Sequence, residues 1–290
     1  MNKKIVIGIP VMDLHELTGQ TLSTSASYLS DRKNTSFVIV DNNSKKIYKQ
    51  PPSGELQIDL IHNKENLGYY YPLLQLYKKY PKADYIGLMH NDAVIFQDGW
   101  DDIIRREFDK DPRLAVVGLF GWQQVTRSAK NELPIGKIYW PFNVYVPKQK
   151  PNYSQYHRRV HKLTPALTLD SLFMVFRREV IPMLAIDKNI TISHGYDKIW
   201  SLRLNQAGHH VAVLGIPFQH KGGSDKDLPM RLMFKEWFDK RWEVNSPVEY
   251  VYDIAFFETQ VLVVNEFRDR GKMIPCRIDD KYKIKKYGKT

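Results

Sequence analysis

The chain has 290 residues, of which 43% are hydrophobic, 12% aromatic and 26% charged. This is enough apolar material for a sizeable core, and the length suits one large domain with an extension. No apolar run approaches the roughly 18 residues that span a bilayer, which disfavours a transmembrane protein. The apolar stretch after Lys4 is too short for a signal peptide, and the single cysteine, Cys276, can form no internal disulfide. We therefore expect a cytoplasmic protein.

The net charge of +11 is concentrated in two segments. Residues 148–162 contain five basic residues and no acidic one, and residues 272–290 contain seven basic residues against two acidic ones. Both segments also contain tyrosines. Concentrated Lys and Arg bind phosphates and aromatic rings stack on bases, so one interpretation is a polyanionic partner. The other is a solvated loop and tail, and composition alone does not decide between them.

The first half of the chain alternates apolar runs with helical patterns. We expect strands at 4–9, 36–40, 56–61, 84–89 and 114–120, and helices at 14–31, 68–80 and 98–108. Pro72 fits only the first turn of its helix, and Asp98 is expected to cap the next one. This alternation predicts an α/β domain with a largely parallel sheet.

The second half is less regular. The pattern dissolves over 121–169, a stretch long enough to indicate a functional or disordered loop. Order returns with an expected strand at 171–176, a helix at 195–207 closed by Gly208, and a strand at 210–216. Two more helices are expected at 229–243 and 247–270, before the basic tail. We thus expect one domain over 1–225 and a helical extension with a basic tail over 226–290.

The carboxyl ends of parallel strands are where ligands bind in such sheets. That rule selects the loops that begin at Pro10, Asp41, Asn63, His90 and Pro217. The chain has no Gly-rich phosphate loop of the G-x-G-x-x-G or Walker type, which disfavours dinucleotide and ATP sites of those kinds. The Asp41 turn either reads a ribose hydroxyl or caps its own backbone, and the turn alone favours the cap.

Polar residues with metal-binding chemistry follow the strand expected at 84–89. That strand delivers His90, Asn91 and Asp92 to its carboxyl end, and a carboxylate with an imidazole suits a divalent cation held largely by substrate phosphates. The alternative is a capped turn. Farther along, Asp197 lies near a helix start, where a carboxylate is often only a cap, and His220 follows a strand.

Six segments occur in an order typical of one enzyme family. They are the opening strand to Pro10, VIVDNNS, NKENLGYYYP, YIGLMHNDAVIFQDGW, LDSLFMVFRREV and GYDKIWSLRLNQAGHHVAVLGIPFQHKGGS. Over roughly residues 3–225 the chain resembles the family-2 glycosyltransferases of the GT-A fold. The resemblance implies a Rossmann-like α/β fold, with a mixed, mostly parallel sheet flanked by helices. It also implies inverting transfer of a sugar from a nucleotide diphosphate sugar, a UDP-sugar being expected, to a hydroxyl group.

The same resemblance implies a role for each matching residue. The donor-binding residues would be Pro10, Asp41, Asn66, Gly68 and Asn91. Asp92 would be the main ligand of Mn²⁺ or Mg²⁺, and His220 would be a second ligand or a phosphate contact. His90 departs from the first acid that is usual in the family.

Two further carboxylates match the catalytic positions. Asp170 would touch the donor sugar or the acceptor, and Asp197 takes the place of the catalytic base. Tyr196 departs from the family here, because many relatives have Glu before the base.

The acceptor is suggested by the charge distribution. A smaller set of compact, virus-encoded relatives glycosylates hydroxymethylated pyrimidines in DNA, and we expect 5-hydroxymethylcytosine in DNA as the acceptor, in a host-cell cytoplasm. Such an enzyme must flip the base and hold the backbone. The expected DNA contacts are Trp122, Lys148, Lys150, Tyr153, Tyr156, Arg158, Arg159, Lys162, Lys283, Lys285 and Lys286. Two alternatives stay open: an enzyme of surface polysaccharide or glycan synthesis, and a non-catalytic module that binds nucleotide sugars or nucleic acid.

Overall fold

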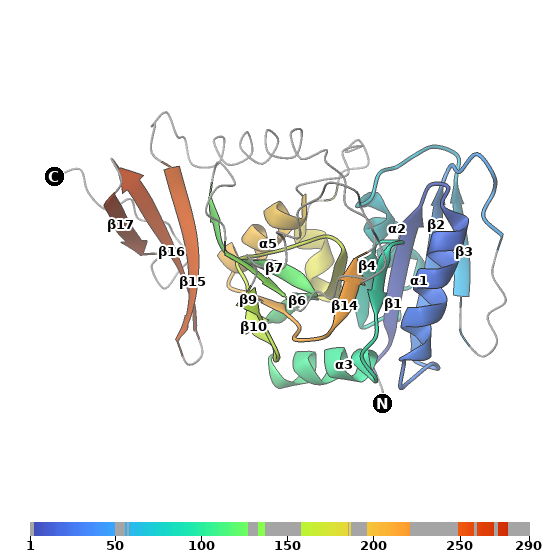
Figure 1. Ribbon diagram of the computed structural model, residues 1–290, viewed down its shortest axis with the longest axis horizontal. Helices are drawn as coiled ribbons and strands as arrows, with labels where there is room; N and C mark the ends of the chain where they lie inside the picture. The colour runs from blue at the N-terminus through green and yellow to red at the C-terminus, as the bar shows by residue number, and fades with distance from the viewer. Residues whose placement is uncertain are drawn as a thin grey trace, which may run out of the picture.

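The computed structural model describes residues 3–49, 56, 58–126, 133–136, 158–184, 186, 196–220, 249–257, 260–269 and 272–277. The described elements form two large sheets and a short ribbon, with helices packed on the first sheet (Figure 1). In chain order they are β1 (Ile5–Val11), α1 (His15–Ser27), β2 (Thr35–Asn42), β3 (Ile58–Asn63), α2 (Tyr71–Lys79), β4 (Tyr85–Met89), β5 (Ala93–Ile95), α3 (Trp100–Lys110), β6 (Leu114–Gly118), β7 (Phe120–Thr126), β8 (Leu133–Gly136), β9 (Arg158–Arg159), β10 (Thr164–Pro165), β11 (Thr168–Leu169), β12 (Phe173–Arg177), the 3₁₀ helix η1 (Arg178–Leu184), α5 (Tyr196–Gln206), β13 (His210–Val213), β14 (Phe218–His220), β15 (Glu249–Phe257), β16 (Gln260–Asp269) and β17 (Lys272–Arg277).

The first sheet is mixed and mostly parallel, with the strand order β10-β13-β6-β12-β4-β1-β2-β3. β1 pairs in parallel with β2 and β4, and β2 pairs in parallel with β3. β12 is antiparallel to both of its neighbours, β4 and β6. The carboxyl ends of β1 to β4 therefore meet at one edge of the sheet, where ligands bind in folds of this type.

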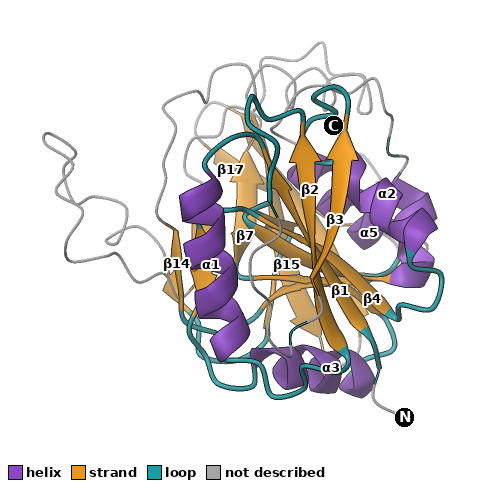
Figure 2. Cartoon of the chain, turned by 90° about the vertical axis from the view of Figure 1, so that its right-hand side faces the viewer, coloured by secondary structure: helices purple, strands orange, loops and turns teal. Residues whose placement is uncertain are grey.

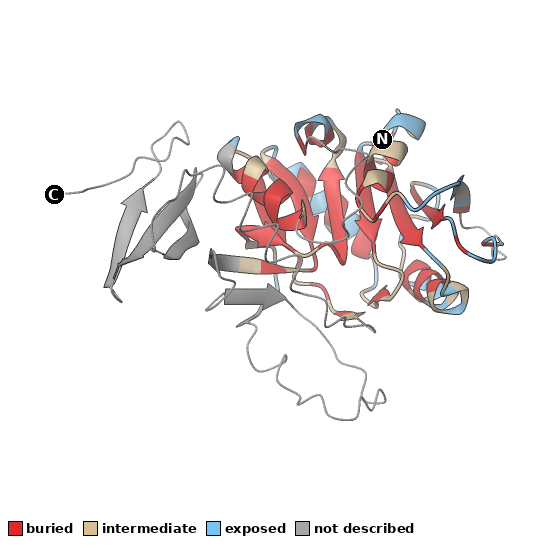
Figure 3. Cartoon of the chain, turned by 90° about the horizontal axis from the view of Figure 1, so that it is seen from above, coloured by how far each residue is buried: buried red, intermediate tan, exposed pale blue. Residues whose placement is uncertain are grey.

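Helices cover both faces of the first sheet (Figure 2). Side chains of a strand alternate between the faces, so Ile5 packs with Leu22 of α1 in one core cluster, whereas Val6 packs with Leu73 of α2 in the other. The first cluster also includes residues of α3, and the second includes residues of α5. Buried residues fill the central strands (Figure 3). Burial on both faces explains why these strands are continuous Val/Ile runs in the sequence.

The second sheet has the order β17-β16-β15-β7-β8-β9, and β11 also pairs with β7. β7 starts two residues after β6 ends, so the second sheet is joined directly to the first. The short ribbon consists of β5 and β14, which are antiparallel and place His220 opposite Ala93. This ribbon lies just beyond the end of β4 and carries one of the expected metal ligands.

Two expectations about the second half of the chain are wrong. The stretch 121–169, expected to be an irregular loop, contains β8 to β11 and most of β7 in its described part. The helix expected over 247–270 is replaced by the antiparallel strands β15 and β16, with β17 beside them. The segment VYDIAFF is dominated by aromatic and β-branched residues, which fit a pleated surface better than a helix.

Of the three residues expected to mark helix ends, two are confirmed and one is wrong. Pro72 does lie in the first turn of α2, and Gly208 follows α5 with a positive φ of 87°, so both are confirmed. Asp98 is not the cap of α3. The N-cap residue is Gly99, which has a φ of 64° and so accepts a left-handed backbone at little cost.

Some expectations fall on residues that are not described. These are the helix at 229–243 and the part of the basic tail beyond residue 277. Among the described helices, none is both long enough and apolar enough to cross a membrane.

Candidate active site

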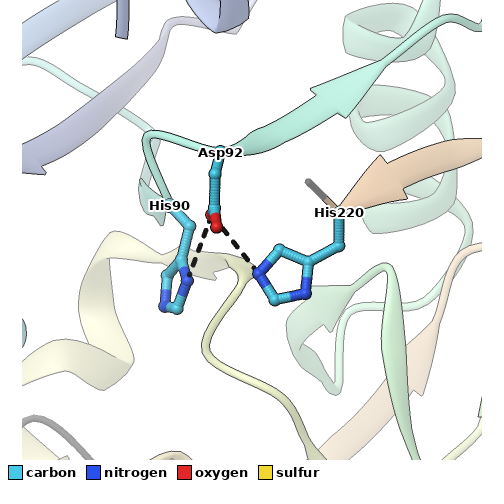
Figure 4. A group of neighbouring side chains, drawn as sticks. All are labelled: His90, Asp92 and His220. Carbon is cyan, nitrogen blue, oxygen red and sulfur yellow. Dashed lines mark ion pairs between the residues drawn. The ribbon is translucent and has the colours of Figure 1, made fainter. Parts of the chain in front are cut away.

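Three expected metal ligands meet at the carboxyl edge of the first sheet. β4 ends at Met89, so His90 and Asp92 lie in the short turn between β4 and β5. His220 is the last residue of β14, whose pairing with β5 brings it back to this turn. The ligand atoms of His90, Asp92 and His220 all lie within 4.8 Å of one another (Figure 4). The three side chains therefore converge, although they come from distant parts of the chain.

The carboxylate of Asp92 lies between the two imidazoles. Its Oδ1 atom is 3.3 Å from Nε2 of His220 and 3.7 Å from Nδ1 of His90. Burial opposes ionisation of Asp92, but the two histidines outweigh it and hold the pKa of Asp92 well below its usual range. Burial likewise opposes the charged form of His220, yet Asp92 raises the pKa of His220 above its ordinary value. The cluster thus has an ionised carboxylate at its centre.

This donor set fits a divalent cation. Oδ1 of Asp92 is buried and makes no hydrogen bond of good geometry, although it faces Nε2 of His220 and Nδ1 of His90, so a cation held among these three atoms would complete its environment. One carboxylate and two imidazoles suit Mn²⁺ and related metals, with further positions left for substrate oxygens. All three side chains keep 16–26% of their surface exposed, so a substrate can reach the cluster.

The expected catalytic base lies deeper than the metal cluster. Asp197 is at the start of α5, as expected, and is only 6% exposed. Its Oδ2 accepts the backbone N–H of Ser171 at 2.9 Å, and its Oδ1 accepts that of Lys198 at 2.8 Å. Burial, with a smaller contribution from the negative charge of Asp170, raises the pKa of Asp197 to about 6. A carboxylate with such a pKa can exchange protons near neutral pH.

Asp170 and Ser171 form the turn between β11 and β12. Oδ1 of Asp170 accepts the backbone N–H of Leu172 at 2.9 Å, which stabilises the turn. Asp170 is partly exposed, unlike Asp197. The turn therefore presents one accessible carboxylate while its backbone binds a second, buried one.

Sequence reasoning missed two residues of this region, Tyr69 and Ser171. The Tyr69 hydroxyl donates to the carbonyl oxygen of Ser171 at 2.6 Å, and its ring packs edge-on against His90 with the ring centroids 4.5 Å apart. The only sequence signal was their position, since Tyr69 lies in the matching segment NLGYYYP and Ser171 directly follows Asp170. Neither residue type suggests a metal or a proton transfer.

The expected donor-binding residues line the ends of β1 to β3, but several are engaged internally. Asp41 is 3% exposed. Its carboxylate accepts the N–H groups of Ser44 and Tyr48 and lies 3.1 Å from Nδ1 of His62. These contacts match the capped-turn interpretation. A contact of Asp41 with a nucleotide stays a prediction.

The neighbouring donor-binding residues form the adjoining loop. Asn66 Oδ1 accepts the N–H of Gly68, and the carbonyl of Gly68 accepts Nδ2 of Asn42 at 2.7 Å. Gly68 has a φ of 74°, a backbone conformation that favours glycine. Pro10 is buried near the end of β1. The loop is thus held in place beside the sheet edge.

Asn91 faces away from the cluster. Its side-chain amide donates to the hydroxyl of Thr18 in α1 at 3.3 Å, and its backbone carbonyl oxygen accepts the hydroxyl of Thr21 at 2.8 Å. These bonds fix the turn between His90 and Asp92 to α1. Its observed contacts are therefore structural, and its donor contact stays a prediction.

The expected acceptor residues are only partly described. Trp122 lies in β7, and the ammonium group of Lys198 is 4.3 Å from the centroid of its ring. Arg158 and Arg159 form β9, and Lys162 is exposed. The remaining ones lie outside the described residues: Lys148, Lys150, Tyr153, Tyr156, Lys283, Lys285 and Lys286. Trp122 thus contacts Lys198, the residue that follows the candidate base in the chain, and the acceptor roles of Trp122 and of the basic segments stay predictions.

Comparison with known proteins gives structural matches only. No family model matches the chain, and no curated protein matches it. Among solved structures it is similar to GalNAc-T7 with UDP, GalNAc and Mn²⁺, at 13% identity and a TM-score of 0.56, over 83% of this chain and 48% of that one.

Two further matches point the same way. The mannosyltransferase PcManGT from Pyrobaculum calidifontis, in complex with GDP-Man and Mn²⁺, matches at 13% identity and a TM-score of 0.50 over 83% of this chain. S. aureus TarS 1–349 matches at 12% identity and a TM-score of 0.50 over 75%. The chain spans 61% and 60% of these two proteins and about half of GalNAc-T7. These likenesses show that the chain has the GT-A fold that its sequence resemblance implied.

Proposed function

We propose that this chain is a metal-dependent glycosyltransferase, which moves a sugar from a nucleotide diphosphate sugar to a hydroxyl group. The observation that carries the proposal is the convergence of His90, Asp92 and His220 at the ligand edge of a GT-A sheet, with the buried Oδ1 of Asp92 between the two imidazoles. Support also comes from two structural matches with bound Mn²⁺, one with UDP and one with GDP-Man.

Each residue has a chemical task in this proposal. Asp92, His220 and His90 would hold the cation, which when bound neutralises charge on the departing diphosphate. Asp197 would accept the proton of the acceptor hydroxyl, whose oxygen bonds to the anomeric carbon as the bond to the diphosphate breaks. The diphosphate leaves with the electron pair of that bond, and one displacement inverts the carbon. Asp170, which is partly exposed, would contact the donor sugar or the acceptor.

Asp197 can act as a base in spite of its two hydrogen bonds. A carboxylate has about four lone-pair sites, and the two backbone N–H groups occupy only two of them. Those bonds also hold the carboxylate in one orientation, which favours proton transfer to a fixed atom. Its pKa of about 6 leaves Asp197 largely ionised at pH 7.

The proposal is tested with Asp92→Asn and Asp197→Asn. The protein is incubated with UDP-sugars and GDP-sugars, Mn²⁺ and a panel of hydroxyl acceptors, and release of the nucleoside diphosphate is measured. We expect Asp92→Asn to lose Mn²⁺ binding and transfer, and Asp197→Asn to keep donor binding while transfer falls at least about a hundredfold. Transfer at the wild-type rate in Asp92→Asn would refute the metal centre. Full activity in Asp197→Asn would show that Asp197 is not the catalytic base.

We propose that the acceptor is 5-hydroxymethylcytosine in DNA and that the donor is a UDP-sugar. The support is the placement of charge, because the basic segments 148–162 and 272–290 hold most of the net charge of +11 and lie outside the donor-binding motifs. Phosphate contacts of that kind hold a duplex while a base is flipped. Synthesis of a surface polysaccharide or another glycan agrees equally well with the fold and with the metal cluster.

A direct comparison of acceptors decides between these two. DNA with 5-hydroxymethylcytosine, the same DNA with unmodified cytosine and a set of oligosaccharides are each incubated with donor and Mn²⁺. We expect a mass gain of one sugar on the hydroxymethylated nucleoside alone. Transfer to an oligosaccharide without any gain on DNA would overturn the DNA acceptor and leave the glycosyltransferase proposal intact.

A further inference from the structure

The turn between β11 and β12 touches both halves of the candidate site. The backbone N–H of Ser171 donates to Oδ2 of the candidate base Asp197 at 2.9 Å. The hydroxyl Oγ of the same residue lies 3.5 Å from Nε2 of His90, one of the candidate metal ligands. Ser171 is only 5% exposed, so water does not replace these contacts easily. One buried residue thus connects the metal cluster with the proton acceptor.

The rest of the turn is fixed from two sides. The backbone N–H of His90 donates to the carbonyl oxygen of Leu172 at 2.8 Å, which ties the turn to the end of β4. Tyr69 donates its hydroxyl to the carbonyl of Ser171 at 2.6 Å and packs its ring on that of His90. The turn therefore has little freedom to move relative to the imidazole, and its geometry is set before any ligand arrives.

The orientation of His90 gives the Ser171 hydroxyl a definite role. The Nδ1 atom of His90 is the one that faces Asp92, at 3.7 Å from Oδ1. An imidazole that offers Nδ1 to a cation carries its proton on Nε2, and that N–H needs an acceptor. The hydroxyl oxygen of Ser171, 3.5 Å from Nε2, is placed to be that acceptor. A partner of this kind fixes the ring and its tautomer.

We propose that Ser171 is a positioning residue of the active site, which orients His90 for the metal through its hydroxyl and Asp197 for proton transfer through its backbone N–H. The inference rests on the proposed glycosyltransferase function. Because the two contacts come from different atoms of one residue, they can be separated by substitution. Removing the hydroxyl leaves the backbone bond to Asp197 in place.

The test uses Ser171→Ala, Ser171→Thr and Ser36→Ala. Ser36 is a matched control, since it is also buried and its hydroxyl has no partner. Mn²⁺ affinity is measured by electron paramagnetic resonance of free Mn²⁺, without substrate, and transfer is measured over a range of Mn²⁺ concentrations. We expect Ser171→Ala to weaken Mn²⁺ binding about tenfold, Ser171→Thr to restore it, and Ser36→Ala to leave it unchanged.

The kinetic outcome distinguishes positioning from a general loss of structure. In Ser171→Ala the transfer rate should return to near the wild-type value at saturating Mn²⁺, because Asp197 is still held. Thermal unfolding of each variant checks that the fold is intact. Suppose that the wild-type chain transfers sugar and that folded Ser171→Ala binds Mn²⁺ as tightly as the wild type. This result would overturn the role of Ser171 but would leave the proposed function intact. A wild-type chain that binds no Mn²⁺ would overturn this inference and the proposed metal dependence together.

Discussion

At the scale of single residues, the site depends on where two aspartates lie. Asp92 is partly exposed between two histidines, which keep it ionised. Asp197 is almost fully buried, and burial favours its protonated form. Two carboxyl groups of the same type thus differ in protonation because of their surroundings, which suits the tasks proposed for them, cation binding by Asp92 and proton exchange by Asp197.

The raised pKa of Asp197 predicts the pH dependence of the reaction. A base must be deprotonated, so transfer should rise with pH through about 6 and level off above it. The measurement is kcat/KM for transfer between pH 5 and 8 at saturating Mn²⁺, which removes the effect of proton competition at the metal ligands. A profile that is flat across this range would contradict the assignment of Asp197.

The same pKa predicts an effect on stability. A carboxyl group whose pKa is raised by folding binds more protons in the folded state, so its contribution to stability falls as the pH rises from about 4 through about 6. Asp197→Asn does not titrate. The melting temperature of this variant minus that of the wild type should therefore increase between pH 4 and pH 7. A constant difference would show that burial does not perturb Asp197.

Residues of the candidate site were predictable from the sequence to different degrees. His90, Asp92 and His220 were found because strand ends and the family resemblance both selected them. Tyr69 and Ser171 are not predictable in this way, because they contact the site through hydroxyl and backbone groups. Such groups occur throughout any sequence and do not mark a site. The internal bonds of Asp41 were foreseen as a capped turn, because Asp followed by small polar residues commonly forms one.

At the scale of elements, the close approach of β4 and β12 can be tested at Gly87. A Cβ atom on Gly87 would lie 2.6 Å from the carbonyl oxygen of Met174 and 2.9 Å from Cγ2 of Val175. Because a backbone atom cannot move aside cheaply, Gly87→Ala should lower the free energy of unfolding by about 3 kcal/mol. Urea denaturation measures the change.

Gly19 supplies the matched control for that substitution. It lies inside α1, and a Cβ atom there would meet nothing within 4 Å. Gly19→Ala should therefore raise the free energy of unfolding by about 0.5–1 kcal/mol, through helix propensity alone. Equal effects of the two substitutions would show that strand spacing does not limit the sheet at Gly87.

Strands that are buried on both faces are easier to predict from the sequence than the strands of the second sheet. The central strands β1, β2, β4 and β6 of the first sheet are buried on both faces and appear in the sequence as largely apolar runs, so their approximate positions are predictable. The helix predicted over 247–270 is wrong, because mixed polar and apolar residues give no clear period in the segment that forms β15 and β16. Strand propensity alone would have favoured the correct assignment.

At the scale of the whole molecule, a metal ion should stabilise the fold. Its ligands come from the turn after β4 and from the end of β14, so a bound cation joins distant segments of the folded chain only. Mn²⁺ at a hundred times its dissociation constant should stabilise the folded state by about 2.7 kcal/mol. The melting temperature should rise with Mn²⁺ in the wild type and stay constant in His220→Ala. An equal rise in both would place the bound metal elsewhere.

The pairing of β14 with β5 also fixes when the cluster of His90, Asp92 and His220 can first form. During synthesis the residues around Asp92 leave the ribosome well before His220 does. At about 5–20 residues per second, the delay is on the order of ten seconds. A partly made chain therefore has His90 and Asp92 but not His220. Under the proposed function, transfer can therefore begin only after the whole of the first sheet has been translated, because its last strand, β13, precedes His220.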